Sequence, residues 1–228
     1  MPSTVYASSN DGIAVQGLNV WADCRGGGGN ATDTGVTRDA AAVQVLGSAR
    51  GGGTYGIRRS FFDFDTSGIT STVATAVFIL RPYGSYDTSD VIAVRSEHSG
   101  TLSNGDFNAF PSAAVTALTN TDGSGGGTFA GISGLTYSGE ITTWGTNVSV
   151  DNEIALNATA MADMESLSTF KICLMEHDYD YSDIPISIGS SVQIGCHFQE
   201  RGGVYRPHID YTLATVVADN ATFFGANF

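Results

Sequence analysis

The chain has 228 residues, of which 42% are hydrophobic, and this is enough for one all-β domain with a substantial core. It carries 10 basic and 23 acidic residues, and a formal net charge of −13 argues against nucleic acid and anionic membrane lipids as partners. Glycine occurs 29 times but Lys171 is the only lysine, so the composition favours strands joined by glycine-rich turns over amphipathic helices.

Short hydrophobic runs bounded by turn residues predict five strands in the first half of the chain. They are residues 13–22, 41–46, 56–64, 74–80 and 91–95. In the third of these, alternation places Phe62 and Phe64 on one face and Ile57 and Phe61 on the other. Polar residues share both faces, so we expect this strand to be buried from both sides or to lie at the end of a sheet. The run ATAVFIL, which ends before Pro82, predicts a fully buried strand.

The second half of the chain adds five more predicted strands and one short helix. The strands are residues 135–142, 153–156, 170–176, 191–198 and 207–214. We expect the strands at 170–176 and 191–198 to be neighbours. Asn157 is the expected N-cap of the helix, which covers residues 158–165. The sequence therefore predicts an all-β fold, a single jelly-roll-type antiparallel β-sandwich over residues 1–214.

A C-terminal tail, residues 215–228, follows the last predicted strand. It contains Phe223, Phe224 and Phe228, and exposure of three phenylalanine rings to water is unfavourable. We expect the tail to pack either on its own domain or on a neighbouring subunit, and in the second case these three residues would serve assembly.

Cys24, Cys173 and Cys196 are an odd number of cysteines with no zinc-ligand spacing. The sequence favours buried free thiols in a protein made in a reducing cytoplasm. A bridge between Cys173 and Cys196 is the alternative. No secretory leader and no membrane-spanning run are recognisable, and we expect synthesis in a cytoplasm without export.

The run HDYDYSD concentrates oxygen ligands in one short loop. Asp178, Asp180 and Asp183 are candidate calcium ligands, because alternate carboxylates in a loop can supply several of the oxygens that calcium requires. The run lacks the glycine and the terminal glutamate of an EF-hand loop. An ordinary acidic loop without a cofactor is therefore the preferred interpretation.

Aromatic residues beside polar ones are candidates for stacking on a sugar ring. They are Trp144, Tyr179, Tyr181 and Tyr205, although most aromatic residues of a sandwich belong to its core. Glycoside hydrolysis needs two facing carboxylates, and Glu176 and Glu200 are the first pair to consider. Solvated charges at strand ends are the preferred interpretation of these two glutamates. The sequence shows no nucleophile elbow and no histidine metal motif, so we expect no catalytic residues.

Seven stretches resemble, in this order, the jelly-roll domains called DNRLRE-like, which are related to carbohydrate-binding modules. They are SNDGIAV from Ser9, IRRSFFDFDTSGI from Ile57, NGDFNAF from Asn104, the lone Trp144, NEIALNATAMADM from Asn152, FKICLMEHDYD from Phe170 and GGVYRPHIDYTL from Gly202. Each stretch is weak alone, and the resemblance depends on their order over nearly the whole chain. Such motifs specify a fold and not a ligand.

This resemblance implies a family found in secreted polysaccharide-active proteins and in phage head or tail surfaces. The expected function is that of a non-enzymatic virion surface protein, a capsid decoration or fibre-type subunit of a phage. Its expected partners are copies of itself, in a homotrimer for example, other virion proteins and host surface glycans. The alternative function is a free carbohydrate-binding module or adhesin.

Overall fold

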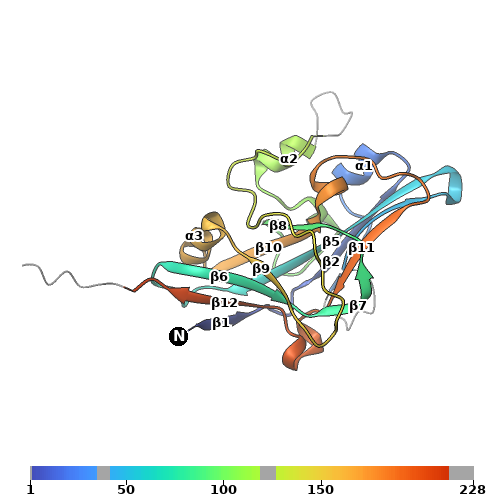
Figure 1. The fold of residues 1–228 in the computed structure, drawn as a ribbon. Helices are drawn as coiled ribbons and strands as arrows, with labels where there is room; N and C mark the ends of the chain where they lie inside the picture. The colour runs from blue at the N-terminus through green and yellow to red at the C-terminus, as the bar shows by residue number, and fades with distance from the viewer. Residues whose placement is uncertain (1, 35–41, 119–126, 216–228) are drawn as a thin grey trace, which may run out of the picture.

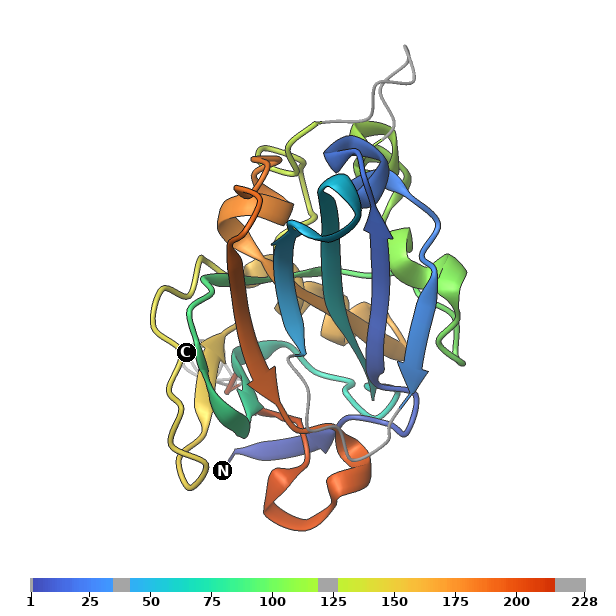
Figure 2. The same cartoon turned by 90° about the vertical axis from the view of Figure 1, so that its right-hand side faces the viewer.

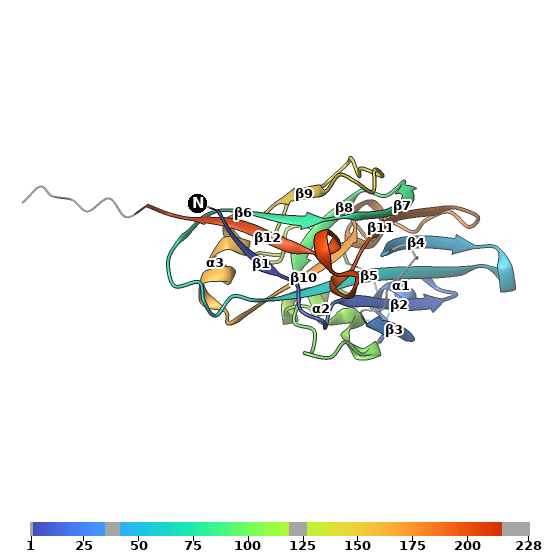
Figure 3. The ribbon, with the colours of Figure 1, turned by 90° about the horizontal axis from the view of Figure 1, so that it is seen from below.

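The computed structural model describes residues 2–34, 42–118 and 127–215, and these form a β-sandwich of two antiparallel sheets (Figure 1). The small sheet has four strands in the order β1-β12-β6-β9. These strands are β1 Ser3–Tyr6, β12 His208–Leu213, β6 Val73–Leu80 and β9 Asn152–Ala155. The first and last strands of the described chain are therefore neighbours, as Figure 3 shows.

The large sheet has eight strands, and most of them lie side by side in Figure 2. Its main path runs β3 Ala31–Thr34, β2 Gly12–Leu18, β5 Thr54–Asp65, β4 Val43–Ser48, β11 Ser191–Cys196 and β7 Pro82–Asp87. A branch adds β10 Thr169–Glu176 and β8 Val91–Arg95. The branch forms because β5 is long: its first half pairs with β4 and its second half pairs with β10.

Among the described residues, three α-helices and several single turns connect the strands. The helices are α1 Trp21–Gly26, α2 Ser112–Leu118 and α3 Ala158–Ser166. The turns are the 3-10 helices η1 Arg50–Gly52, η2 Asn104–Asn108, η4 Gln199–Arg201 and η5 Gly203–Tyr205, and the π-helical turn η3 His177–Tyr181. The predicted helix is confirmed with its cap, because Asn157 Oδ1 accepts a hydrogen bond from Ala160 N at 3.0 Å.

The large sheet separates two hydrophobic cores. The first core fills the space between the sheets and includes Phe62, where the ring centroid lies 5.1 Å from that of Phe78 on the small sheet. The second core lies on the opposite face, where α1, α2 and long loops cover Ile57 and Phe61 (Figure 1). Of the two alternatives predicted for β5, burial on both faces is therefore the correct one. The all-β sandwich is confirmed too, while the jelly-roll topology stays a prediction.

Two predictions for the first half of the chain are wrong. The first strand ends at Leu18, and Trp21 begins helix α1 instead of extending the strand. Residues Trp21, Cys24 and Arg25 are buried with helical spacing, and the charge of Arg25 hid that pattern. Strand β6 is not fully buried, because its residues alternate between the first core and the exposed outer face of the small sheet.

Three further predictions are corrected by the strand pairing. Residues 135–142 form no strand and make only isolated bridges, Val94 to Thr136 and Val91 to Ile141. Pro82 begins an unforeseen strand, β7, at the edge of the large sheet, where its missing N–H is tolerated. Strands β10 and β11 are not neighbours, because β10 pairs with β5 and β8 whereas β11 pairs with β4 and β7.

The positions of the cysteine side chains follow from this strand pairing. Cys173 belongs to the second core and Cys196 to the first, so the sheet itself separates the two side chains. All three cysteines are free and buried, which confirms the expected buried thiols and excludes the bridge in this structure. Burial raises the pKa of the Cys24 thiol to about 11 and raises the pKa values of Cys173 and Cys196 as well. None of these thiols is a ready nucleophile.

Candidate functional site

The most unusual part of the described backbone follows β10 and covers residues 176–183. His177–Tyr181 forms the π-helical turn η3, a rare geometry that is often found at functional sites. Asp183 then adopts a φ of 58°, in the left-handed region that L-residues seldom occupy. We refer to these residues as the Glu176–Asp183 segment and describe its inner and outer sides in turn.

Glu176 supports the turn from inside. Its carboxylate is buried and accepts hydrogen bonds from Asp178 N at 3.0 Å, Tyr179 N at 2.6 Å and Asp180 N at 3.0 Å. Burial raises the pKa of Glu176 to about 7, although the three N–H donors oppose the shift. Since the backbone occupies both oxygens, Glu176 acts as the cap of η3 and does not face a cleft.

Asp180 points inward to two arginines, and the three residues form what we call the arginine–aspartate cluster. Arg59 Nε lies 2.7 Å from Asp180 Oδ2 and Arg59 Nη2 lies 2.6 Å from Asp180 Oδ1, a bidentate pair. Arg25 Nε lies 3.5 Å from Asp180 Oδ1 and donates to the Asp180 carbonyl. All three side chains are at most 1% exposed.

The arginine–aspartate cluster joins segments that lie far apart in sequence. Arg59 Nη1 donates to Phe107 O at 2.8 Å, and its guanidinium lies 4.1 Å from the centre of the Phe107 ring. Arg25 Nη1 donates to Gly127 O at 2.6 Å and lies 3.6 Å from Asp183 Oδ1. The cluster thereby connects α1, β5 and η3 to two long loops. Its burial indicates a structural role, because no ligand has access to these charges.

The three predicted calcium ligands do not converge on one point. Asp180 is neutralised by arginines, and Asp183 accepts a hydrogen bond from Trp21 Nε1 at 3.0 Å and faces Arg25. Asp178 points outward on the other side of η3, where its side chain is 55% exposed. The three carboxylates therefore form no shared site in this structure, because the arginines already hold two of them.

The outer side of η3 carries a different group of ligand-type side chains. Glu140, His177 and Asp178 bring one oxygen or nitrogen atom each to within 4.8 Å of one another. His177 Nδ1 lies 3.2 Å from Glu140 Oε1 and 3.2 Å from Asp178 Oδ1. We call this group the His177 cluster.

Most of the predicted sugar-stacking residues belong to the cores. Trp144 lies in the first core and Tyr181 in the second, with exposures of 6% and 7%, and Tyr179 packs partly buried against the second core. A sugar ring needs an accessible aromatic face, so Trp144 and Tyr181 do not fit that role. Tyr205 is half-buried in η5, with its ring centroid 4.8 Å from that of His197.

The two candidate catalytic glutamates are not brought together. Glu176 lies at the η3 end of the large sheet, whereas Glu200 lies in η4, which follows the other end of β11 (Figure 2). Glu200 is near Asp11, a fully buried carboxyl that accepts a hydrogen bond from Gln199 N at 2.8 Å. Burial, followed by the negative charge of Glu200, raises the pKa of Asp11 to about 9.

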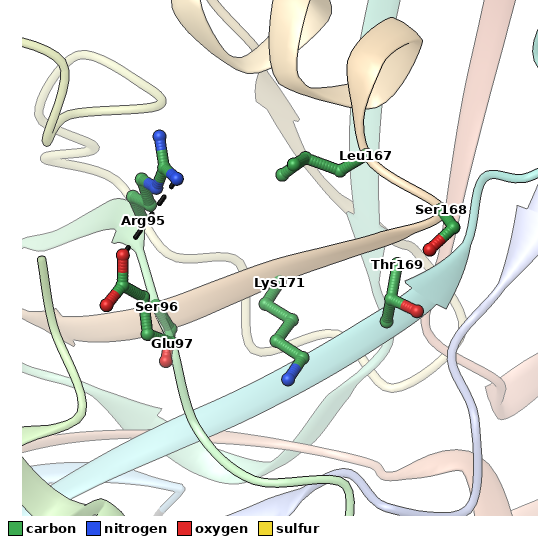
Figure 4. A pocket seen from close by; sticks show the side chains of 7 residues that line it. All are labelled: Arg95, Ser96, Glu97, Leu167, Ser168, Thr169 and Lys171. Carbon is green, nitrogen blue, oxygen red and sulfur yellow. Dashed lines mark ion pairs between the residues drawn. The ribbon is translucent and has the colours of Figure 1, made fainter.

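A shallow hollow of about 280 Å³ opens between the end of β8 and the turn that leads from α3 into β10 (Figure 4). It is lined by Arg95, Ser96, Glu97, Leu167, Ser168, Thr169 and Lys171. Its two cations are engaged, because Arg95 lies 3.3 Å from Asp163 and 3.9 Å from Glu97 and Lys171 donates to His98 O. The hollow therefore offers no free charge that would select a ligand.

Comparison with known proteins adds no family assignment: no family model matches the chain, and no curated protein matches it significantly. The resemblance to DNRLRE-like domains stays a prediction. No helix among the described residues is long and apolar enough to cross a membrane. Phe223, Phe224 and Phe228 lie outside the described residues.

Sequence reasoning missed the residues that organise this region. Arg59 carries the one visible signal, a charge within the hydrophobic run GIRRSFFDF, since a buried arginine requires a partner. Arg25 and Glu140 have no such signal, because their partners follow 155 residues and 37 residues later in the chain.

Proposed function

We propose that this protein is a non-enzymatic structural protein that acts through contacts with copies of itself and with other proteins of a virus particle. The observation that carries the proposal is the exposed edge of the small sheet. β1 is its outermost strand, and Ser3, Thr4 and Tyr6 on it are exposed. An edge strand presents unpaired N–H and C=O groups to which another chain can add.

The position of the first and last described strands supports the same proposal. Ser3 pairs with Tyr211, so β12 ends beside the beginning of β1. The sequence continues after β12 with a segment that contains Phe223, Phe224 and Phe228. An edge strand next to the attachment point of an aromatic segment is a suitable place for assembly contacts. The formal charge of −13 favours attachment to a basic surface.

The native mass of the chain, measured by light scattering, tests this proposal. We expect the full chain to form a trimer or larger assembly, and a chain lacking residues 215–228 to be monomeric with an unchanged circular dichroism spectrum. Substitution of serine for the three phenylalanines should have the same effect without shortening the chain. A monomeric full chain, or a truncated chain that assembles normally, would contradict the proposal.

A carbohydrate-binding module or adhesin is the second candidate, favoured by the surroundings of η4 and η5. Tyr6 is 46% exposed, with the guanidinium of Arg206 4.2 Å from its ring centre. Tyr205 contacts His197 and lies below the guanidinium of Arg201. Aromatic rings beside hydrogen-bonding cations are a suitable surface for sugars.

A glycan array separates the two candidates. The carbohydrate-binding module would be favoured if glycan binding is lost in Tyr6→Ala and in Tyr205→Ala. Binding should be kept in Tyr55→Ala, a substitution near the start of β5. Absence of glycan binding by the intact, assembled protein would remove this candidate and leave the first.

A further inference from the structure

We propose that the His177 cluster, formed by Glu140, His177 and Asp178, binds a divalent transition-metal ion of the zinc type. The site is independent of the assembly function. It shares only Asp178 with the calcium ligands that the sequence predicts, and it uses neither Asp180 nor Asp183.

The spacing of the three ligand atoms fits one small ion. Zinc binds histidine nitrogen and carboxylate oxygen at roughly 2.0–2.2 Å, so neighbouring ligand atoms of a tetrahedral or octahedral site lie roughly 3.0–3.5 Å apart. The two distances from His177 Nδ1, to Glu140 Oε1 and to Asp178 Oδ1, are both 3.2 Å. All three atoms lie within 4.8 Å of one another.

Hydrogen bonding alone does not satisfy both carboxylates at His177 Nδ1. His177 Nδ1 carries at most one proton, yet carboxylates approach the same nitrogen from two different residues. One proton shared between two anionic acceptors leaves net negative charge at the site. A divalent cation would neutralise both carboxylates and accept the nitrogen lone pair, and the formal charge of −13 on the chain favours that exchange.

The backbone holds the ligands in place from two sides of Val91. On one side Val91 bridges to Ile141, which follows Glu140, with both N–H···O distances at 2.8–3.0 Å. On the other side Val91 pairs with Glu176, which precedes His177. Two ligands from separate segments are therefore positioned by the same residue of β8.

The histidine ring is held as well. It stacks on the Tyr181 ring at a centroid distance of 5.4 Å and an interplanar angle of 18°. His177 N donates to Asp90 O at 2.8 Å, and His177 O accepts a hydrogen bond from Ser182 Oγ at 2.9 Å. A ring fixed in this way binds a metal with little loss of side-chain freedom.

The ligand types select the metal. An imidazole nitrogen suits zinc, nickel, cobalt and copper, whereas calcium prefers six to eight oxygens. The side chains of Glu140 and Asp178 are 38% and 55% exposed, so water can fill the remaining positions. The buried cysteines do not compete for the ion, because the cores enclose all three.

Isothermal titration of the chelator-treated full chain with zinc chloride tests the proposal. We expect saturable binding of one ion per chain that an excess of calcium does not displace. His177→Ala and Glu140→Gln should each weaken binding by more than about tenfold, at least the effect that the loss of an outer partner has at metal sites. His208→Ala is the matched control: its Nδ1 faces Arg206 O instead of a carboxylate, and the substitution should leave zinc binding unchanged.

Glu140→Gln keeps the experiment decisive if His177→Ala unfolds, because it alters one oxygen of an exposed residue and leaves the Tyr181 stacking intact. Cobalt provides an independent readout, since its visible absorption reports nitrogen and oxygen ligation. Absence of saturable zinc binding would overturn the proposal. Equal affinity in the wild type and Glu140→Gln, or displacement of zinc by calcium, would overturn it as well.

Discussion

The carboxylate of Asp180 receives two parallel hydrogen bonds from the guanidinium of Arg59 at a position where both side chains are completely buried. The two residues are 121 positions apart in sequence. Their contact holds the turn η3 against β5, the central strand of the large sheet. A buried pair of this kind is costly to break because its remaining partner keeps an uncompensated charge.

Replacement of Arg59 by methionine should therefore lower the free energy of unfolding by about 3–5 kcal/mol. Urea denaturation followed by circular dichroism measures the change. Arg81→Met is the matched control, since Arg81 also forms a bidentate pair, with Asp151, but the two side chains are 14% and 30% exposed. We expect a loss of about 1 kcal/mol or less there. Equal losses in both variants would contradict the role assigned to the arginine–aspartate cluster.

Asp11 should make stability fall as the pH rises. Its carboxyl ionises near pH 3.8 in the unfolded chain and near pH 9 in the folded protein, so between these values the folded state retains a proton that the unfolded state has lost. The free energy of unfolding therefore decreases across this window. Asp11→Asn removes this ionisable group. Urea denaturation should therefore show that the free energy of unfolding of the variant rises relative to that of the wild type between about pH 5 and about pH 8.

Between about pH 5 and about pH 8, each pH unit should lower the free energy of unfolding of the wild type by about 1.4 kcal/mol relative to Asp11→Asn, because one proton separates the folded from the unfolded state. Glu200→Gln should give a smaller change in the same direction, because it removes the nearby negative charge that also raises the Asp11 pKa. Parallel pH profiles for the wild type and Asp11→Asn would show that folded Asp11 does not retain its proton in this range.

Gly47 is required by a close backbone approach. A Cβ atom at this position would lie 2.5 Å from Ser187 O, and Gly47 O accepts a hydrogen bond from Gly189 N at 2.6 Å. Gly47→Ala should therefore destabilise the fold by about 1–3 kcal/mol. At Gly68 a Cβ atom meets nothing within 4 Å, so Gly68→Ala should change stability by about 0.5 kcal/mol or less. Thermal unfolding of both variants compares the two sites.

The cysteines should be unreactive in the folded protein. Cys24, Cys173 and Cys196 are buried, and burial raises all three thiol pKa values. A thiol reagent such as Ellman's reagent should label none of them in native buffer and all three in denaturant. A single reactive thiol in denaturant, instead of three, would reveal a disulfide and contradict the separation of Cys173 and Cys196 by the large sheet.

Local patterns predict some elements of this fold and miss others for identifiable reasons. Burial of both faces of β5 is one of the two alternatives that its sequence pattern predicts, and the start of α3 follows from Asn157. Helix α1 was missed because Arg25, a charged residue, occupies one of its buried positions. For the site, the acidic and aromatic residues after Glu176 marked this run as a candidate. The sequence did not predict which of these residues face inward and which face outward.

The sequence by itself determines that strands with glycine turns form a β-sandwich, because alternation and turn chemistry are local properties of the chain. Only the tertiary structure decides which strands pair and what each polar side chain meets. Arg59 reaches Asp180, and Glu140 reaches His177, across long separations that no local pattern encodes. Long-range pairing follows from burying both faces of the large sheet at once, and that requirement turns Asp180 inward to the arginines and Asp178 outward to the His177 cluster.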